Sequence, residues 1–383
     1  MLATGNGSVE LTAETAPPEA VGQPVFTPLA LFLLGENPTL DVAARGGSQS
    51  IAGFGDPPSE LAALLHSVGL YDLGFRTRIS VRGEDKFRWL NGMATNAVAT
   101  LAEGHGNYNF ILNAQGRIQG DADIYRDATR LIVETDRSQA ARLMEHFERF
   151  IIMDDVELAD LSETATALGL AGPHAPALLA RLGIAGAAGL EQMQFMAASL
   201  ADVPVTVVRT YDPLVPRFEI WFDPIHTTGI WKLLRESGAT PAGLAAENAL
   251  RVLEGTPLYG VDIRDRNLVQ ETSQTRALNF TKGCYLGQEI VERIRSRTTV
   301  HRFLRRLELT GSVPSQGAEL RAPGEQRAAG TLTSVASYAL PGLPATLALG
   351  YVRGDILDRK LLIEYDGGTA TVLDRPPAIQ QPA

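Results

Sequence analysis

The sequence has few of the residues that form disulfides or bind metals. Its 383 residues include a single cysteine, Cys284, which excludes an intrachain disulfide and a metal site built from cysteines. The six histidines are scattered and include no closely spaced pair of the kind that binds zinc. We therefore expect no metal site in this chain, and a reducing cellular compartment.

Long apolar runs and an excess of positive charge are also missing. The longest uncharged apolar run near the N-terminus, Leu29 to Leu34, is far shorter than the ~20 residues that span a bilayer. No Lys or Arg precedes Arg45, whereas a secretory signal begins with basic residues. The net charge of -10 argues against non-specific binding along a nucleic-acid backbone. We expect a cytoplasmic protein with no membrane partner and no direct nucleic-acid binding.

The composition is nevertheless that of a globular protein. Hydrophobic residues make up 45% of the chain and charged residues 20%, which is enough apolar material for a large core. The length predicts two or three domains. Residues 1–60 are rich in Pro, Gly, Ser and Thr without a steady apolar period, so we expect a flexible N-terminal extension.

The residues that follow predict two similar α/β units. In residues 61–160, a predicted strand from Arg78 to Val81 and a helix over 87–94 come first. Strands at 107–112, 118–125 and 130–134 and a helix with Ser138 as its N-cap follow. Residues 161–298 show a similar order: a strand at 167–171, a helix at 177–182, strands at 203–209 and 217–222 and a helix at 227–237. A further helix is predicted at 241–253. Two strand-helix-strand-strand-helix runs are typical of ferredoxin-like units.

Short strands and turns dominate residues 299–375. Apolar segments at 303–309, 331–338, 346–352, 360–365 and 370–373 are separated by Gly and Pro. This spacing favours a small antiparallel β-barrel, and residues 376–383 are expected to form a tail. The expected fold class is therefore α+β, with two ferredoxin-like α/β units and a C-terminal antiparallel β-barrel.

The single cysteine lies in an unusual octapeptide. Residues 282–289 read Lys-Gly-Cys-Tyr-Leu-Gly-Gln-Glu, which places Cys284 beside one of only four lysines, Lys282. From residue 282 to 306 seven basic residues face two acidic ones, and positive charge close to a thiol favours its reactive thiolate form. A lone cysteine is otherwise most often a small buried residue, so both interpretations stay open on this ground.

The octapeptide resembles the Lys-Gly-Cys-Tyr-x-Gly-Gln-Glu signature of the YgfZ family, whose folate-binding members are related to the T-protein of glycine cleavage. Further resemblance lies in the segment 249–255 with Leu258-Tyr259-Gly260, in the strand at 217–220 and in the turn at 113–116. It spans about residues 69–373. Such relatives form a three-part ring of two related α/β units and a β-barrel, which encloses a channel for tetrahydrofolate.

The resemblance also implies a set of functional residues. A pterin presents a guanidine-like edge that suits a carboxylate, and the glutamate tail of a folate is anionic and suits arginine. Glu219 and Arg251 match these two requirements. The full set of site residues that it implies is Glu219, Arg251, Tyr259 and Gln288 for binding tetrahydrofolate or a derivative, and Cys284, Lys282 and Asp121 for catalysis.

One departure bears on the reaction. T-proteins follow the turn at 113–116 with paired aspartates, one of which positions the cofactor during aminomethyl transfer. The matching stretch here reads Gln119-Gly120-Asp121-Ala122-Asp123, so one of the pair is retained. Asp121 can keep that role, although Asp121 and Asp123 also fit outward-facing positions on a strand.

The resemblance leads to one preferred function and two alternatives. The preferred one is a YgfZ-like, tetrahydrofolate-binding protein that supports assembly or repair of iron-sulfur clusters, in some members for tRNA-modifying enzymes. One cysteine cannot hold a cluster alone, so Cys284 would act with iron-sulfur assembly factors or client proteins. The first alternative is a tetrahydrofolate-dependent aminomethyltransferase that uses Asp121. The second is an interaction scaffold, which the intact octapeptide disfavours.

Overall fold

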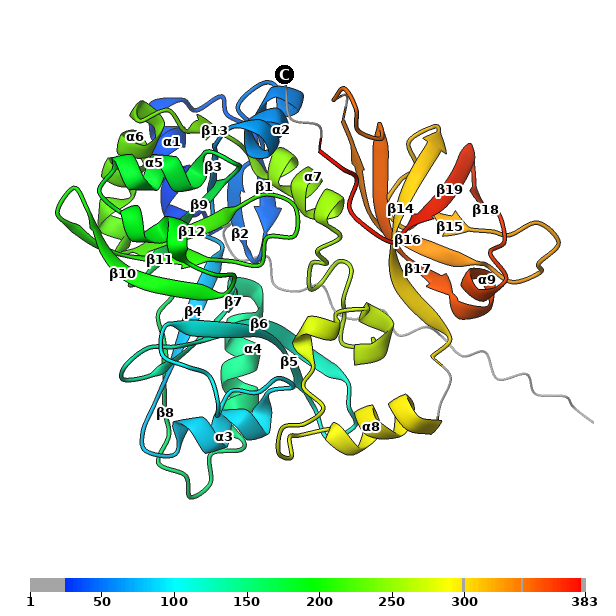
Figure 1. Ribbon diagram of the computed structural model, residues 1–383, viewed down its shortest axis with the longest axis horizontal. Helices are drawn as coiled ribbons and strands as arrows, with labels where there is room; N and C mark the ends of the chain where they lie inside the picture. Colours follow the sequence, from blue (N-terminus) through cyan, green and yellow to red (C-terminus); the bar gives the residue numbers. More distant parts are fainter. Residues whose placement is uncertain (1–24, 298–299, 339, 380–383) are drawn as a thin grey trace, which may run out of the picture.

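The computed structural model describes residues 25–297, 300–338 and 340–379. Its two main parts are an 11-stranded sheet and, at the C-terminal end, a six-stranded barrel (Figure 1). A long connection from Gly255 to α8 (Gln288–Arg297) joins them. Within the described residues, no helix has the length and apolar character needed to cross a membrane.

The large sheet consists of two halves that meet edge to edge. The first half contains, in spatial order, β13 (Thr240–Pro241), β3 (Gly69–Asp72), β9 (Thr166–Ala171), β12 (Arg217–Phe222), β11 (Val203–Arg209) and β10 (Gln194–Leu200). The second half continues with β5 (His105–Leu112), β6 (Ile118–Arg126), β7 (Leu131–Asp136), β4 (Arg76–Arg82) and β8 (Glu157–Asp160). Gln194 of β10 pairs with His105 of β5, which makes one continuous layer of the two α/β units.

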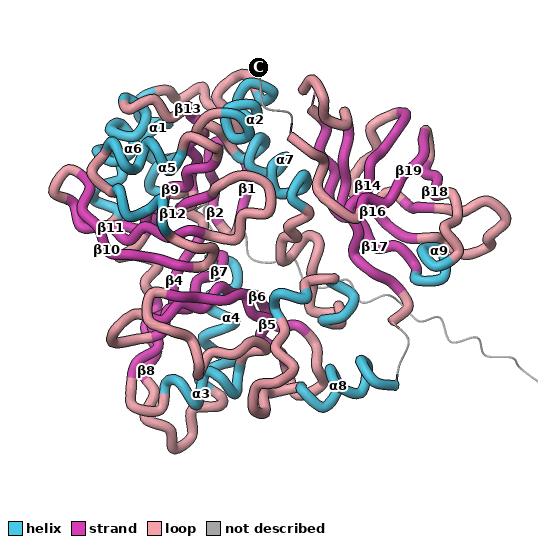
Figure 2. Tube along the Cα trace, in the orientation of Figure 1, coloured by secondary structure: helices cyan, strands magenta, loops and turns pink. Residues whose placement is uncertain are grey.

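Helices cover one face of each half (Figure 2). On the first half, α5 (Ala175–Arg181) and α6 (Thr227–Glu236) place Leu178 and Trp231 in one buried cluster with Phe218 of β12. On the second half, α3 (Lys86–Met93) and α4 (Arg137–Glu148) bury Leu90 and Phe147 against its strands. Short 3-10 helices lie in the connections: η1 (Ala185–Gly189), η2 (Pro224–His226), η3 (Val269–Thr272) and η4 (Thr275–Ala277).

The start of α4 differs from the prediction. Asp136, and not Ser138, is the N-cap residue, and its side chain makes no capping hydrogen bond. The reason is that Asp136 ends β7 and its carboxylate pairs with Arg76 at 3.3 Å. The chain therefore passes directly from strand to helix, with Ser138 already inside the first turn.

The predicted N-terminal extension is partly folded. Residues 1–24 of it lie outside the described residues, but the rest forms α1 (Pro28–Glu36), β1 (Val42–Arg45), β2 (Ser48–Ile51) and the start of α2 (Pro57–His66). The hydroxyls of Thr27 and Ser50 both donate to the buried carboxylate of Asp72 on β3. Leu29 is also buried, so this segment is anchored to the first half of the sheet by polar and apolar contacts.

The predicted boundary at residue 61 also differs from the structure. β3 falls within the predicted first unit, yet it pairs with β9, with Gly69 opposite Ala171. α2 packs against α7 (Leu244–Glu254), and Leu64 and Leu250 belong to one buried cluster. The apolar sides of α2 and β3 are thus covered by residues that come much later in the chain.

The C-terminal barrel confirms the predicted short strands. Its strand order is β15 (Glu319–Leu320), β16 (Gly330–Ser337), β17 (Thr346–Arg353), β14 (Arg302–Gly311), β19 (Gly368–Leu373) and β18 (Ile363–Tyr365). The backbones of Arg321 and Glu364 exchange two 2.8 Å hydrogen bonds, which bring the two edge strands together and nearly close the barrel. The short helix α9 (Gly354–Asp358) packs on β17. The expected fold of two α/β units and a barrel is confirmed.

Candidate functional site

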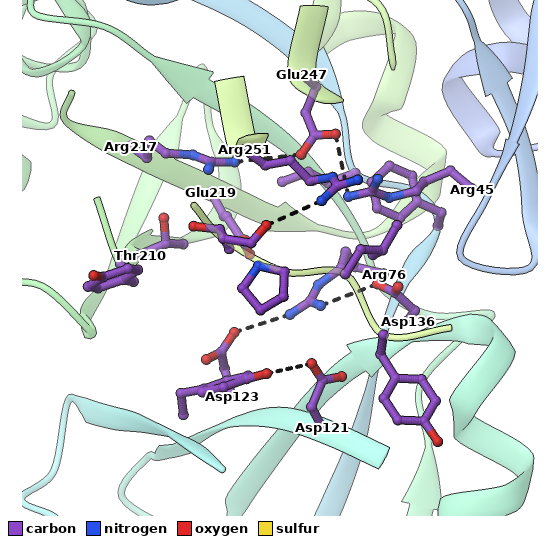
Figure 3. Close-up of a pocket in the computed structure, with 18 of the residues that line it drawn as sticks. Arg45, Arg76, Asp121, Asp123, Asp136, Thr210, Arg217, Glu219, Glu247 and Arg251 are labelled. Carbon is purple, nitrogen blue, oxygen red and sulfur yellow. Dashed lines mark hydrogen bonds and ion pairs between the residues drawn. The ribbon is translucent and has the colours of Figure 1, made fainter. Parts of the chain in front are cut away.

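A polar pocket lies where the two halves of the sheet meet α7 (Figure 3). Its cavity volume is about 130 Å³. Its charged and aromatic lining residues are Arg45, Phe75, Arg76, Tyr108, Asp121, Asp123, Asp136, Tyr211, Arg217, Glu219, Glu247, Arg251, Tyr259 and Arg276. Four of the seven predicted site residues, Asp121, Glu219, Arg251 and Tyr259, are among them.

Asp121 faces the pocket from β6. Its carboxylate accepts hydrogen bonds from the hydroxyl of Tyr108 at 2.6 Å and from Nε2 of Gln139 at 2.9 Å. No arginine pairs with it among the described residues, and burial raises the pKa of the Asp121 carboxyl above its ordinary value. Two hydrogen bonds therefore hold the Asp121 carboxylate in place, but no ion pair within the described residues neutralises its charge. A carboxyl group of this type takes up a proton more readily than an ordinary aspartate does.

Asp123 faces the same pocket because alternate residues of a strand share one side. Nη2 of Arg76 lies 3.3 Å from Asp123 and 3.4 Å from Glu134, while Nη1 lies 3.3 Å from Asp136. Burial raises the pKa of Asp123 to about 6, against the lowering effect of Arg76 and Arg276. Asp123 thus belongs to a cluster of three carboxylates around Arg76.

Glu219 enters the pocket from β12 and is only 8% exposed. Its Oε2 accepts a 2.7 Å hydrogen bond from Nε1 of Trp221. The nearest arginine, Arg78, lies 4.0 Å from that oxygen and is already paired with Glu134 at 2.7 Å. Burial, together with the nearby charge of Glu134, raises the pKa of Glu219 to about 8. Glu219 therefore keeps its proton to a higher pH than an ordinary glutamate does, and one of its oxygens is free of any described protein donor.

Arg251 lies on α7 and is 4% exposed. Its Nη1 pairs with Asp262 at 2.8 Å, its Nη2 donates to the hydroxyl of Ser334 at 2.8 Å, and its Nε donates to Asn248 at 2.8 Å. Because Ser334 lies on β16, this one side chain ties α7 to the barrel. Most of its hydrogen-bonding capacity is used within the protein.

Tyr259 lies at the rim of the pocket, between the sheet and the long connection. Its hydroxyl donates to the carbonyl oxygen of Gln119 at 3.1 Å and accepts from Arg142 at 2.5 Å. The guanidinium of Arg142 also lies 5.1 Å from the centre of its ring. The Tyr259 side chain therefore fastens the connection to β6 and α4.

The other three predicted residues lie outside this pocket. Cys284 is exposed, and neither Lys282 nor Gln288 lines the pocket. Nζ of Lys282 donates to three backbone carbonyl oxygens at the end of α3, those of Asn91, Ala94 and Asn96, at 2.6, 2.6 and 2.7 Å. Burial lowers the pKa of Lys282 to about 7. The three hydrogen bonds use every N–H of its ammonium group, so Lys282 holds the loop against α3.

A second contact fixes the same loop. Gly287 has a positive φ of 81°, and a Cβ placed there would lie 2.6 Å from the carbonyl oxygen of Asn113. The side-chain oxygen of Gln288 accepts a 3.2 Å hydrogen bond from the backbone N–H of Tyr285. The octapeptide and the turn at 113–116, two motifs far apart in sequence, thus pack directly together and present Cys284 on the surface.

The sequence analysis missed several pocket residues, above all Arg76 and Arg276. Arg76 gave one usable signal, since it lies two residues before Arg78, and alternate residues of a strand share one side. Arg276 gave no such signal, because it lies in the short helix η4 within the long connection between α7 and α8. No group of three or more His, Cys, Asp or Glu side chains in the described part of the chain is arranged to hold a metal ion.

Comparison with known proteins defines the class of this fold and site. The model of the GCVT N-terminal domain family matches residues 56–282, more than half of the chain, and the protein belongs to this family. In the solved glycine cleavage system aminomethyltransferase T of Bartonella henselae, the same fold recurs with a TM-score of 0.80 and 22% identity. The match covers 92% of this chain and 98% of that one.

Curated relatives match about three quarters of this chain. An aminomethyltransferase of Rubrobacter xylanophilus is 28% identical over 296 residues, which cover 77% of this chain and 78% of the relative. An aminomethyltransferase of Streptomyces coelicolor is 29% identical over 310 residues, covering 78% and 82%. A putative chloroplastic transferase of Arabidopsis thaliana is 25% identical over 299 residues, covering 76% and 68%.

Proposed function

We propose that the protein binds tetrahydrofolate in the central pocket. The observation that carries this proposal is the buried carboxyl of Glu219, which faces the pocket without an arginine in hydrogen-bond contact. Such a group suits the guanidine-like edge of a pterin, which donates two parallel hydrogen bonds. Phe75, which also lines the pocket, supplies an aromatic surface for the rings of the ligand.

The function best supported for this site is one-carbon transfer of the aminomethyltransferase type. The family and the curated relatives favour it, and Asp121 provides a positioned carboxylate in the pocket. When bound, tetrahydrofolate would supply the nitrogen that accepts the one-carbon unit. In this proposal Asp121 orients that nitrogen and holds a proton beside it, while Tyr108 and Gln139 fix the carboxylate.

A second candidate function is the YgfZ-like support of iron-sulfur clusters, with assembly factors or client proteins as partners. One observation favours it: Cys284 is exposed on a loop that Lys282 and Gly287 hold in place, although this loop lies outside the pocket. A thiol displayed in this way is available to a partner protein. Both functions use the same folate pocket and differ in the residue on which activity depends.

A turnover assay separates the two candidates. Wild type, Asp121→Asn and Cys284→Ser are each supplied with tetrahydrofolate and an aminomethylated lipoyl protein. Aminomethyl transfer predicts turnover by wild type and by Cys284→Ser, and at least a ~100-fold loss in Asp121→Asn. Absence of turnover in wild type would overturn the transferase. The same variants are then expressed in cells lacking their own family member, where failure of Cys284→Ser alone to restore iron-sulfur enzyme activity supports the second candidate.

A further inference from the structure

The arginines that line the pocket form ion pairs, with one exception. Five arginines line it: Arg45, Arg76, Arg217, Arg251 and Arg276. Four of them form ion pairs. Arg45 lies 3.4 Å from Glu247, and Arg76 lies 3.3 Å from Asp123. Arg217 lies 2.7 Å from Glu254, and Arg251 lies 2.8 Å from Asp262. Among the residues that the structure describes, Arg276 has no carboxylate partner.

Arg276 is nevertheless held in a fixed orientation. Its guanidinium lies 4.0 Å from the centre of the Tyr108 ring and 4.2 Å from that of Tyr211, so two rings from different parts of the chain clasp it. Its Nε donates to Oε1 of Gln274 at 3.3 Å. Within the described part of the chain, its two Nη nitrogens have no protein acceptor. A stacked guanidinium with free N–H groups is pre-organised to bind a carboxylate through both nitrogens.

We infer that Arg276 binds a carboxylate of the glutamate tail of tetrahydrofolate. This inference rests on the proposed folate site and extends it, because Arg251, which the sequence resemblance pointed to, has its donors engaged by Asp262, Ser334 and Asn248. The pocket thus offers a carboxyl group that can accept hydrogen bonds, Glu219, and a cation without a carboxylate partner among the described residues, Arg276. A folate carries the complementary pair of groups, a donor edge on the pterin and an anion on the tail.

Tyr108 links this anion site to the candidate reactive group. Its ring supports Arg276, and its hydroxyl donates to Asp121 at 2.6 Å. Occupation of Arg276 by the tail would therefore hold in place the same tyrosine that orients Asp121. The tail would contribute affinity and also keep the carboxylate of Asp121 in position.

The test compares two ligands that differ only in the tail. Wild type, Arg276→Gln and Arg276→Lys are titrated with tetrahydrofolate and with tetrahydropteroate, which lacks the glutamate. We expect wild type to prefer tetrahydrofolate about ten- to a hundredfold, because a charge-assisted hydrogen-bonded pair is lost with the tail. Arg276→Gln should reduce this preference to less than about threefold, and Arg276→Lys should give an intermediate value because its ammonium is not planar.

Arg295→Gln is the matched control, because the Arg295 guanidinium is also stacked on an aromatic ring, at 3.9 Å from the centre of Phe280, but lies outside the pocket. It should keep the wild-type preference. If Arg276→Gln weakens both ligands by the same factor, or neither, Arg276 is not the tail ligand and the inference fails while the folate site stands. If wild type binds neither ligand, the folate site and this inference both fail.

Discussion

The hydroxyl of Tyr108 donates a 2.6 Å hydrogen bond to the carboxylate of Asp121, across neighbouring strands β5 and β6. Tyr108 is 8% exposed, and burial together with the charge of Asp121 holds its pKa well above the ordinary value of 10. The phenol therefore stays protonated and remains the donor throughout the physiological range. This fixed donor gives Asp121 one orientation in the pocket.

The first prediction concerns this pair. Asp121→Asn should lower the rate of one-carbon transfer by at least about 100-fold, because the amide cannot accept a proton. Tyr108→Phe should lower it less, by about tenfold, since the carboxylate remains but loses one hydrogen bond. Steady-state rates at saturating tetrahydrofolate measure both effects. Equal rates in Asp121→Asn and wild type would exclude the assigned role.

The second prediction is that tetrahydrofolate binding releases a proton. Glu219 has a raised pKa of about 8, whereas its proposed partner, the donor edge of the pterin, requires an ionised carboxylate. Below pH 8 the proton must leave on binding, so the affinity should rise with pH up to about 8 and then level off. Calorimetry in two buffers of different ionisation enthalpy counts the proton. A Glu219→Gln variant that keeps the same pH dependence would show that another group is responsible.

The third prediction concerns stability without ligand. In the unfolded chain Glu219 ionises near 4.5, whereas in the folded protein it keeps its proton up to about pH 8. Its contribution to stability is therefore fully present below pH 4.5 and is lost as the pH rises towards 8, by at most about 1.4 kcal/mol per pH unit. Glu219→Gln should lose less unfolding free energy than wild type between about pH 5.5 and 8. Urea denaturation at both pH values measures these losses. If wild type and Glu219→Gln lose the same unfolding free energy between the two pH values, the prediction is wrong.

The fourth prediction concerns Arg251. Replacing it by Met leaves Asp262 buried without its cation, so the free energy of unfolding should fall by about 3–5 kcal/mol. Arg321→Met is a suitable control, because Arg321 pairs with Glu319 at 2.9 Å on the barrel surface. That change should leave the free energy of unfolding nearly unchanged, because an exposed ion pair contributes little. If both variants lost a similar free energy of unfolding, the buried pair would contribute no more to stability than the exposed pair, and the prediction would be wrong.

Much of the fold was predictable from local pattern. The strand predicted at 203–209 coincides with β11, and that at 217–222 coincides with β12, because alternating apolar residues occur between clear turn residues. The position of β3 was not predictable, since its pairing with β9 joins residues about a hundred positions apart. Local periodicity does not contain such information.

In the candidate site, too, some features were predictable from local sequence pattern and others depend on tertiary packing. Asp121 and Asp123 were identified as residues on one side of a strand, and the structure shows that this side faces a pocket rather than open solvent. The stacking of the Arg276 guanidinium on Tyr108 and Tyr211 could not be predicted from the sequence. The three residues lie in separate segments that tertiary packing brings together. The ionisation of Glu219 likewise depends on burial and on Glu134 of a different strand.

The most direct test of the account is a crystal structure of the protein with a stable reduced folate, 5-formyltetrahydrofolate. We predict that the pterin edge lies in the central pocket with its nitrogens at about 2.7–3.2 Å from the carboxyl oxygens of Glu219. Its glutamate tail should extend to Arg276. A ligand found outside this pocket, or one whose pterin edge has no contact with Glu219, would contradict the proposed site.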